Sequence, residues 1–257
     1  MHLTNAIPRS NLILLGRDAN ADIQCDLALS IPEIHLEQQI ERVIHVAGKA
    51  HIVPKNAAEE KAFYDVNEEG TRHLLKGLDN LKCIPKQVVF ISSVAVYNNP
   101  TPYAQSKLNA EQLITDWCVK NTCNALILRL PLIFGFGAPG NLGAMERAIQ
   151  KGYYFGVGTG KAKRSVVLIE ELVEELCHLV GSESGTYNLI SKDMSYKDVE
   201  AIFASKYHKK IRRLPSIFVQ LLARIGNFVP GFPINSYRLQ KLETSETYPN
   251  TFTSKRL

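Results

Sequence analysis

Several features that would place this sequence in a specialised class of protein are missing from it. The N-terminus has no apolar signal core, and no run reaches the ~18 apolar residues that a membrane-spanning helix needs. Internal repeats and low-complexity tracts are also missing. The five cysteines are Cys25, Cys83, Cys118, Cys123 and Cys177. Their number is odd and they form no C-x-x-C pair, which argues against a disulfide framework or a zinc site. We therefore expect a cytoplasmic protein with reduced thiols and no bound metal.

What is present is the composition of an ordinary globular protein. Of the 257 residues, 45% are hydrophobic and 21% are charged, which is typical of folded chains with a full core. The net charge of +5 is mildly basic. The basic run HKKIRR at 208–213 has no interleaved aromatic residues for stacking on bases, so we interpret it as a solvated face and expect no nucleic-acid partner. Acidic lipid and nucleic acid are the less favoured alternatives.

The most apolar segment, IFVQLLARIGNFVPGF at 217–232, is interrupted by Arg224 and Pro230. We interpret it as an amphipathic packing helix that ends near Gly226. Contact with a membrane surface is the less favoured alternative, so membrane association is not expected.

Short apolar runs alternate with helical periodicity along the chain. The runs suit parallel strands that are covered on both faces, and they lie at 11–15, 21–25, 42–47, 87–92, 125–130 and 186–190. Helices are predicted at 32–41, 60–79, 104–121, 141–151, 170–181, 195–206 and 215–226. This alternation predicts an α/β fold with a doubly wound parallel, Rossmann-like sheet. The pattern loosens from about residue 135, which predicts a core at 1–134 and a small C-terminal lobe at 135–257, with the strand at 186–190 returning to the sheet.

Residues with unusual chemistry follow the ends of these strands. Ligands bind beyond the carboxyl ends of the strands in an open parallel sheet, so residues at that edge outline a cleft. They are Asp26 after the second strand, Ala47 and Gly48 after the third, Ser92 and Ser93 at the end of the fourth, and Pro131 after the fifth.

The stretch SSVAVYNNPTPYAQSK at 92–107 holds a serine, a tyrosine and a lysine close together. Tyr103 and Lys107 are four residues apart, so a helix carries them on one face. The Y-x-x-x-K spacing alone is weak, because such pairs arise often by chance. The structural alternative is a strand end, a helix start and a solvated lysine.

An ordered series of segments resembles one family. The segments are CDL (25–27), VIHVAGKAH (43–51), VNEEGT (66–71), FISSVAVY (90–97), YAQSK (103–107), LRLPLIFGFG (128–137) and GVGTGKAKRSVVLIEEL (156–172). In this order they are similar to the extended short-chain dehydrogenases/reductases of the nucleotide-sugar epimerase/dehydratase group. The resemblance implies a dinucleotide-binding core at 1–134 and a mainly substrate-binding lobe at 135–257.

The resemblance implies a role for three residues of the stretch at 92–107, namely Ser93, Tyr103 and Lys107. Tyr103 would be the acid/base, with Lys107 lowering its pKa from near ~10 and hydrogen-bonding the nicotinamide ribose. Ser93 would hydrogen-bond the reacting hydroxyl or ketone of the sugar.

The resemblance also implies a nicotinamide dinucleotide as cofactor. Gly16 stands where NAD-binding relatives usually carry an acidic residue, and Arg17 could accept a 2′-phosphate, so NAD and NADP both remain open. Ala47 and Gly48 would let the dinucleotide approach the backbone. Asp26 and Leu27 would flank the adenine. The other implied cofactor contacts are Asn67, Ser92, Tyr103, Lys107 and Pro131. For Asn67 and Thr71, packing against the catalytic helix is an equal alternative.

The C-terminal part carries the implied substrate contacts. Asn141 lies at an expected helix N-terminus, which favours a pyrophosphate. Arg164 matches the family arginine that clamps a nucleotide diphosphate with its fork-shaped guanidinium. The resemblance thus implies a 4-epimerase or 4-ketoreductase that acts on a nucleotide-diphosphate sugar in surface polysaccharide biosynthesis, and it leaves a homodimer open.

Two departures from the family pattern affect these expectations. The loop between Ser93 and Tyr103 is short, which implies a more open or differently tuned cleft. No G-x-x-G-x-x-G stands near the N-terminus and no strand precedes 11–15, so we expect the first, central strand and its phosphate-binding turn to be missing from the sheet. Residues 1–27 should then be loosely held and dinucleotide binding weak. The alternative function is a non-catalytic nucleotide-binding relative that lost the phosphate-binding loop.

Overall fold

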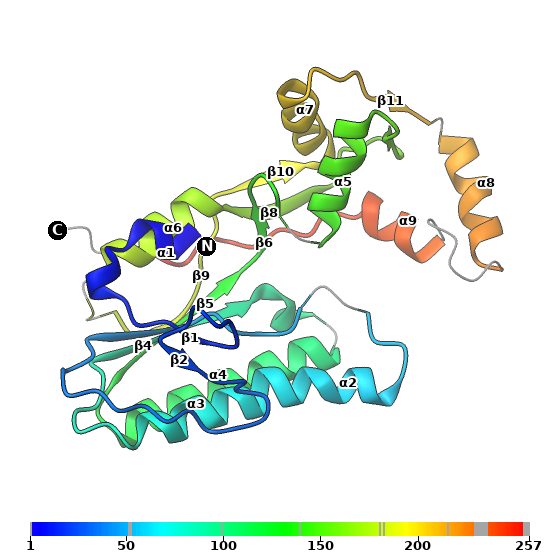
Figure 1. The fold of residues 1–257 in the computed structure, drawn as a ribbon. Helices are drawn as coiled ribbons and strands as arrows, with labels where there is room; N and C mark the ends of the chain where they lie inside the picture. The colour runs from blue at the N-terminus through cyan, green and yellow to red at the C-terminus, as the bar shows by residue number, and fades with distance from the viewer. Residues whose placement is uncertain are drawn as a thin grey trace. The chain divides into compact units, whose positions relative to one another are not determined.

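The computed structural model describes residues 2–50, 53–98, 100–138, 140–179, 181, 183–214, 216–228 and 236–253. The chain forms two compact units, whose elements are labelled in Figure 1. The first unit comprises Met1–Pro131, Glu170–Leu189 and Asn250–Leu257, and the second comprises Leu132–Ile169 and Ile190–Pro249. Within the described ranges, no helix has the length and apolar character that crossing a membrane requires.

The first unit is built on a four-stranded parallel sheet with the strand order β3-β4-β5-β9, of which β4, β5 and β9 are labelled in Figure 1. Its strands are β3 (Arg42–His45), β4 (Gln87–Ser93), β5 (Asn124–Leu130) and β9 (Gly185–Asn188), and each neighbouring pair is parallel. Val88, Val89 and Phe90 of β4 are fully buried. Successive side chains point to opposite faces of a strand, so both faces of the sheet are covered at β4. The predicted α/β fold with a parallel sheet is confirmed.

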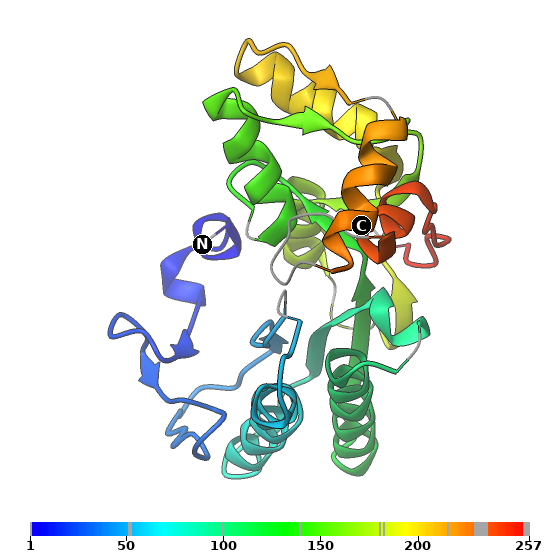
Figure 2. The ribbon, with the colours of Figure 1, turned by 90° about the vertical axis from the view of Figure 1, so that its right-hand side faces the viewer.

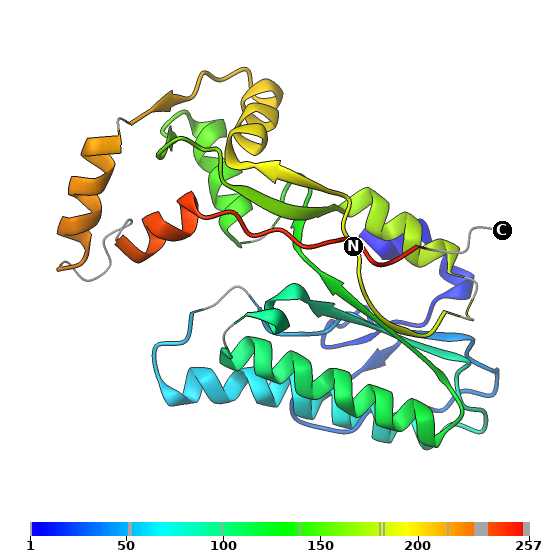
Figure 3. The same cartoon turned by 180° about the vertical axis from the view of Figure 1, so that it is seen from behind.

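Helices cover both faces of this sheet. The helices α2 (Ala57–Tyr64), η2 (a π-helical turn, Asp65–Glu69), α3 (Gly70–Leu78) and α4 (Pro102–Lys120) lie along one face, and α6 (Ile169–His178) lies on the other (Figures 1 and 3). The Thr101 hydroxyl caps α4 by accepting a hydrogen bond from Ala104 N, and Pro102 occupies the start of the helix. This start places Tyr103 in the first turn of α4.

The N-terminal strands form a separate, smaller sheet. Its elements are α1 (His2–Ala6), the 3-10 turn η1 (Arg9–Asn11), β1 (Leu15–Gly16) and β2 (Ile23–Gln24). Among the described residues, β1 pairs in parallel with β2 alone, and β3 pairs with β4 alone. Leu15, Ile23 and Val43 nevertheless pack against one hydrophobic cluster. The expected break in the sheet is therefore confirmed, and Figure 2 shows the blue β1–β2 pair apart from the larger sheet.

The helix predicted at 32–41 is wrong, because these residues contain no helical turn. Ile34 is buried in the same cluster as Leu74 of α3. Pro32 lies so close to Gly77 that a Cβ at Gly77 would come within 2.6 Å of its ring. Tertiary packing therefore holds the segment extended along α3 and overrides the local periodicity.

The second unit contains strands that the sequence pattern did not reveal. A sheet with the order β10-β8-β6 consists of β6 (Leu132–Phe134), β8 (Lys163–Leu168) and β10 (Lys192–Ser195), and β7 (Phe155–Gly156) pairs with β11 (Arg212–Arg213). The helices are α5 (Gly140–Lys151), α7 (Tyr196–Lys206), α8 (Ser216–Gly226) and α9 (Ser236–Glu243), of which α9 was not predicted. The end of the apolar segment at 217–232, from residue 229 on, lies outside the described residues.

Candidate active site

The end of β4 and the first turn of α4 bring Ser93 and Tyr103 together. The Ser93 hydroxyl is near enough to the Tyr103 phenol to lower its pKa. The Ser93 hydroxyl also accepts a hydrogen bond from Ala95 N at 3.2 Å, which fixes its position at the strand end. On another side the Tyr103 ring packs against Phe63 of α2, with the ring centroids 6.0 Å apart. The phenol and the serine hydroxyl can therefore address one ligand atom.

The surroundings of Tyr103 favour its protonated form. Burial raises the pKa of the phenol above its ordinary value, and the nearby Ser93 hydroxyl opposes that rise. Lys107 was expected to lower this pKa, and the structure does not show that effect. Its ammonium group is directed instead to the carbonyl of Ile91 and the ring of Phe90. At neutral pH Tyr103 is therefore a hydroxyl that can donate a proton.

Lys107 is a buried cation beneath the end of β4. Its Nζ donates a hydrogen bond to Ile91 O at 2.9 Å and lies 4.5 Å from the centroid of the Phe90 ring. Burial lowers the pKa of Lys107 to about 8, and the carboxylate of Glu111, one turn further along α4, opposes this change. Lys107 therefore carries its charge at neutral pH and loses it at mildly alkaline pH.

A buried ion pair next to Lys107 was missed by the sequence analysis. Arg129 of β5 donates two hydrogen bonds to Glu111, from Nε at 3.0 Å and from Nη2 at 2.5 Å. The hydroxyl of Ser92 donates a third at 2.5 Å, so this expected cofactor contact is already engaged through its side chain. The side chains of Glu111 and Arg129 are 6% and 17% exposed. The only sequence signal was the i, i+4 spacing of Lys107 and Glu111 on one helix.

The π-helical turn η2 positions Asn67. Such turns are rare and are frequently found at functional sites. The buried Asn67 accepts a hydrogen bond from Lys49 N at 2.7 Å through Oδ1, and its Nδ2 donates to Lys49 O at 3.2 Å and to Ser106 Oγ at 2.9 Å. Asn67 thus ties the loop after β3 to α4, the helix that carries Tyr103. These contacts indicate that Asn67 positions this loop relative to α4.

Thr71 and His45 continue this network into the core. The Thr71 hydroxyl donates to Asn67 O at 2.6 Å, so it accepts from His45 Nε2, which lies 2.9 Å away. Burial lowers the pKa of His45 to about 3, and the nearby positive charge of Lys107 acts in the same direction. His45 is therefore neutral, with its proton on Nε2.

The loop after β3 has no room for a side chain at Gly48. A Cβ there would lie 2.9 Å from Lys107 Nζ and 3.1 Å from Asn67 Oδ1. Ala47 and Gly48 are both exposed. An open backbone directly beside a buried cation fits the close approach of a nicotinamide ribose, the contact expected of these residues.

The residues expected at the adenine end lie on the smaller sheet. Arg17 follows β1, and its Nη1 lies 3.8 Å from Oδ2 of Asp26, which follows β2. Asp26 Oδ1 also accepts a hydrogen bond from Ala28 N at 3.0 Å, while Leu27 lies against Gly70 at the start of α3. An ion pair this long between an exposed arginine and a half-buried aspartate is weak, so both charged groups can rearrange toward a ligand.

The two residues expected to contact the substrate's diphosphate lie in the second unit. Asn141 is exposed in the first turn of α5, at a helix N-terminus as expected. Arg164 of β8 donates from Nη1 to Thr244 O at 2.5 Å, and its guanidinium lies 5.5 Å from the centroid of the Tyr196 ring. Pro131 is the last residue of the first unit before β6.

The chain thus combines a Rossmann-like sheet with a serine–tyrosine pair and a buried lysine at its edge. Residues 11–189 match the NAD dependent epimerase/dehydratase family. The chain belongs to this family. The resemblance carried by the ordered segments is confirmed, and the match spans all the expected site residues, from Arg17 to Arg164.

Two relatives share between a quarter and a third of the aligned residues with this member of the family. The N-acetyl-alpha-D-glucosaminyl-diphospho-ditrans,octacis-undecaprenol 4-epimerase of Escherichia coli O157:H7 is 29% identical over 168 residues, which cover 58% of this chain and 50% of the relative. The UDP-glucose 4-epimerase of Vibrio cholerae is 28% identical over 150 residues, which cover 51% and 45%. The chain therefore spans about half the length of these relatives.

Solved structures share the fold at lower identity. A UDP-glucose 4-epimerase of Thermus thermophilus in complex with NAD has a TM-score of 0.65 at 17% identity, over 93% of this chain and 88% of that chain. A UDP-N-acetylglucosamine 4-epimerase of Methanobrevibacter ruminantium in complex with UDP-N-acetylmuramic acid has a TM-score of 0.64 at 20% identity, over 83% and 80%. These likenesses agree with the predicted Rossmann-like class.

Proposed function

We propose that the chain acts as an NAD(P)-dependent 4-epimerase or 4-ketoreductase of diphosphate-linked sugars. The observation that carries the proposal is the group at the end of β4, where the Ser93 hydroxyl lies near the Tyr103 phenol and Lys107 is held as a buried cation. The names of both relatives describe 4-epimerases of sugars carried on a diphosphate. This supports the same substrate class here.

Each residue of the group has a distinct task in this reaction. A nicotinamide dinucleotide bound beside Gly48 would accept the C4 hydrogen of the sugar as hydride and return it. As the C4–H bond breaks, the Tyr103 phenolate takes the proton of the O4 hydroxyl, and it gives a proton back when the ketone is reduced. Ser93 donates a hydrogen bond to the same oxygen. Lys107 would hold the ribose.

The raised pKa of Tyr103 has a consequence for this cycle. The phenolate that starts sugar oxidation is the scarcer form at neutral pH, because burial favours the phenol. The rate of sugar oxidation should therefore rise with pH as the phenolate forms. The phenol that donates in the return step is the abundant form.

The diphosphate contacts belong to the second unit. We propose that Asn141, in the first turn of α5, and Arg164 hold the diphosphate of the substrate. Arg164 would exchange its hydrogen bond to Thr244 O for one to a phosphate oxygen. The undecaprenol carrier in the name of one relative supports a sugar donor carried on either a nucleotide or a polyprenol, and a role in surface polysaccharide biosynthesis.

A second candidate function is a nucleotide-binding protein without catalysis. The observation that favours it is the break between β1 and β3, which lies where the sheet would hold a dinucleotide. Fluorescence titration with NADH and NADPH, followed by NMR of UDP-N-acetylglucosamine, UDP-glucose and polyprenyl-diphosphate-linked N-acetylglucosamine, separates the two. The enzyme binds a dinucleotide and converts one of the sugars. Binding without conversion of any sugar supports the second candidate.

A further inference from the structure

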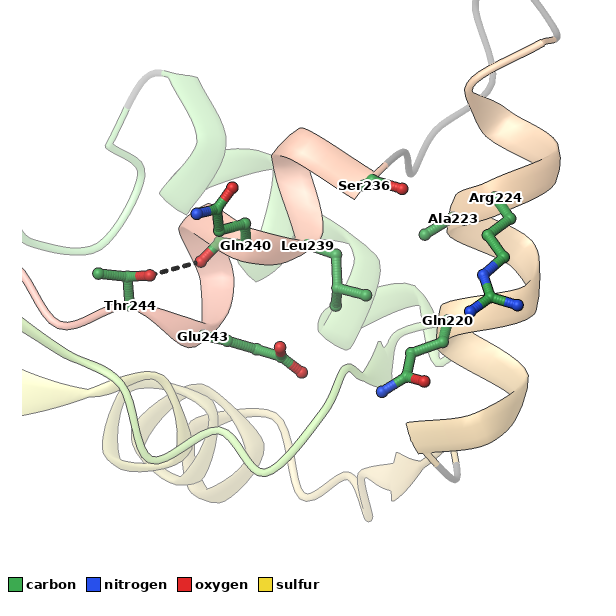
Figure 4. A pocket seen from close by; sticks show the side chains of 8 residues that line it. All are labelled: Gln220, Ala223, Arg224, Ser236, Leu239, Gln240, Glu243 and Thr244. Carbon is green, nitrogen blue, oxygen red and sulfur yellow. Dashed lines mark hydrogen bonds between the residues drawn. The ribbon is translucent and has the colours of Figure 1, made fainter.

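Helix α8 has two apolar faces, and one of them is exposed. On the covered face, Val219 and Ala223 are buried against Leu239 of α9. Figure 4 shows Ala223 on the side of α8 that faces α9. The exposed apolar residues are Ile217 (80% exposed), Phe218 (61%), Leu221 (56%), Ile225 (45%) and, in the turn after the helix, Phe228 (86%). The packing helix predicted for this segment is therefore confirmed for one face only.

The exposed residues form a single stripe along the helix. A helix turns by about 100° per residue, so Ile217, Phe218, Leu221 and Ile225 fall within an arc of about 100°. Val219 and Ala223 lie on the other side. The pocket of about 310 Å³ between α8 and α9 is partly polar, with Gln240 and Glu243 in its lining (Figure 4). The stripe is thus a separate surface from the α8–α9 contact.

The stretch of sequence that contains this stripe, residues 201–242, is basic and has no acidic residue. Residues 201–242 hold eight of the 30 Lys and Arg residues and none of the 25 Asp and Glu residues. The rest of the chain therefore holds 22 basic and 25 acidic residues, so the net charge of +5 arises from this segment. Among the residues whose side chains the structure describes, its exposed cations are Lys206, which pairs with Glu146, and Lys209, Lys210, Arg212 and Arg224.

We propose that α8 and the basic residues before it form a surface that docks on an anionic phospholipid bilayer. A helix with an exposed apolar stripe and flanking cations lies in the membrane interface, with the stripe in the acyl boundary and the cations among the headgroups. A second copy of the chain fits this surface less well. A two-fold contact would bring the same acid-free segment of each copy together, and like charges would face each other.

The inference extends the proposed function to its lipid-carried substrate. A sugar on a polyprenyl diphosphate is presented at the bilayer surface, and a docked chain would meet it there. The docking test uses neither sugar nor dinucleotide. A lack of vesicle binding would therefore not contradict the proposed reaction, and a lack of sugar conversion would not contradict the docking surface.

Cosedimentation of the full chain with lipid vesicles tests the proposal. We expect binding to vesicles of phosphatidylglycerol mixed with phosphatidylcholine, little binding to phosphatidylcholine alone, and a loss of binding as salt is raised. The double variant Ile217→Ser/Phe218→Ser should reduce binding to the anionic vesicles by about tenfold or more. Lys209→Gln/Lys210→Gln should reduce it most at low salt. Both pairs are exposed, so circular dichroism should show unchanged folding.

A matched control separates the stripe from apolar exposure in general. Val119, at the end of α4 in the first unit, is 77% exposed, and Val119→Ser should leave vesicle binding unchanged. Equal binding to neutral and anionic vesicles, no binding to either, or full binding by the stripe variant would overturn the proposal. A different result would also overturn it. If the wild type does not bind vesicles but forms a dimer in sedimentation velocity, and the stripe variant abolishes this dimer, the stripe serves a second copy of the chain.

Discussion

The two sheets of the first unit differ in how their strands are held. β4 is hydrogen-bonded on both edges, over seven residues to β5 and over four to β3, whereas β1 pairs over two residues with β2 on one edge. The expected site residues divide in the same way. Ser93, Tyr103 and Lys107 stand on the well-paired sheet and its helix, and Arg17 and Asp26 stand at the ends of the smaller one. The end of the candidate site that is proposed to carry the chemistry is therefore firmly held, and the end expected to hold adenine is weakly held.

Hydrogen exchange tests this difference directly and should show the largest effect. The amides of Ile23 and Cys25 are hydrogen-bonded within the small sheet, and those of Val89 and Ile91 belong to β4. Local opening of a short, one-sided pair costs little, whereas β4 opens only on global unfolding. We expect protection to be ~10³-fold or more greater in β4. Equal protection would mean that the small sheet is held in another way.

The ion pair of Glu111 and Arg129 should account for part of the rigidity of the larger sheet. Glu111→Gln removes a buried carboxylate and leaves the half-buried guanidinium of Arg129 without its charge partner, so the free energy of unfolding should fall by about 3–5 kcal/mol. Urea denaturation measures this loss. Glu37 forms an exposed pair with Lys82, and Glu37→Gln should cost less than ~1 kcal/mol. A similar small loss for both variants would contradict the assigned role.

Acid should weaken the larger sheet through His45. The pKa of His45 in the folded chain is about 3, well below the ordinary value of 6.5, so below pH 6.5 the unfolded chain binds a proton that the folded chain does not. Stability should therefore fall as pH falls from 6.5 toward 3, by about 2 kcal/mol from this group between pH 7 and pH 5. Urea denaturation of the wild type and of His45→Gln measures it. An identical slope against pH in both would show that His45 does not contribute.

The smallest effect is expected at the weakly held end. Arg17→Ala removes an exposed side chain with one long ion-pair contact, so stability should change by less than ~1 kcal/mol. If Arg17 accepts a 2′-phosphate, the variant should weaken NADPH binding by about tenfold and leave NADH binding unchanged. Titration with both dinucleotides measures this difference. Equal losses for the two would exclude the 2′-phosphate contact.

Local patterns in the sequence predicted the parts of the molecule whose determinants are local. The apolar runs located the strands of the larger sheet, and the four-residue spacing located Tyr103 and Lys107 on one helix. The features that the sequence did not predict depend on contacts between residues that are far apart in the chain. Glu111 and Arg129 are 18 residues apart and meet only because β5 packs on α4. Residues 32–41 have helical periodicity, but Pro32 and Ile34 are held extended by α3.

In the second unit, too, local sequence patterns were not enough to predict the structure. Its strands are two to six residues long, which is too short for a period of two to be recognised. In α8, periodicity identified an apolar helix, yet it does not tell which of two apolar faces is covered. The contact of Ala223 with Leu239 decides that, and it joins residues that no sequence pattern relates.

The most direct test of the proposed function follows the C4 hydrogen of the sugar. The chain is mixed with NAD⁺ or NADP⁺ and with UDP-glucose, UDP-N-acetylglucosamine or polyprenyl-diphosphate-linked N-acetylglucosamine, each carrying deuterium at C4. We expect deuterium to reach the nicotinamide ring, as detected by mass spectrometry. We also expect Tyr103→Phe to slow this transfer by ~10²-fold or more without weakening dinucleotide binding. Label that stays on every sugar while the dinucleotide binds, or near wild-type transfer by Tyr103→Phe, would contradict it.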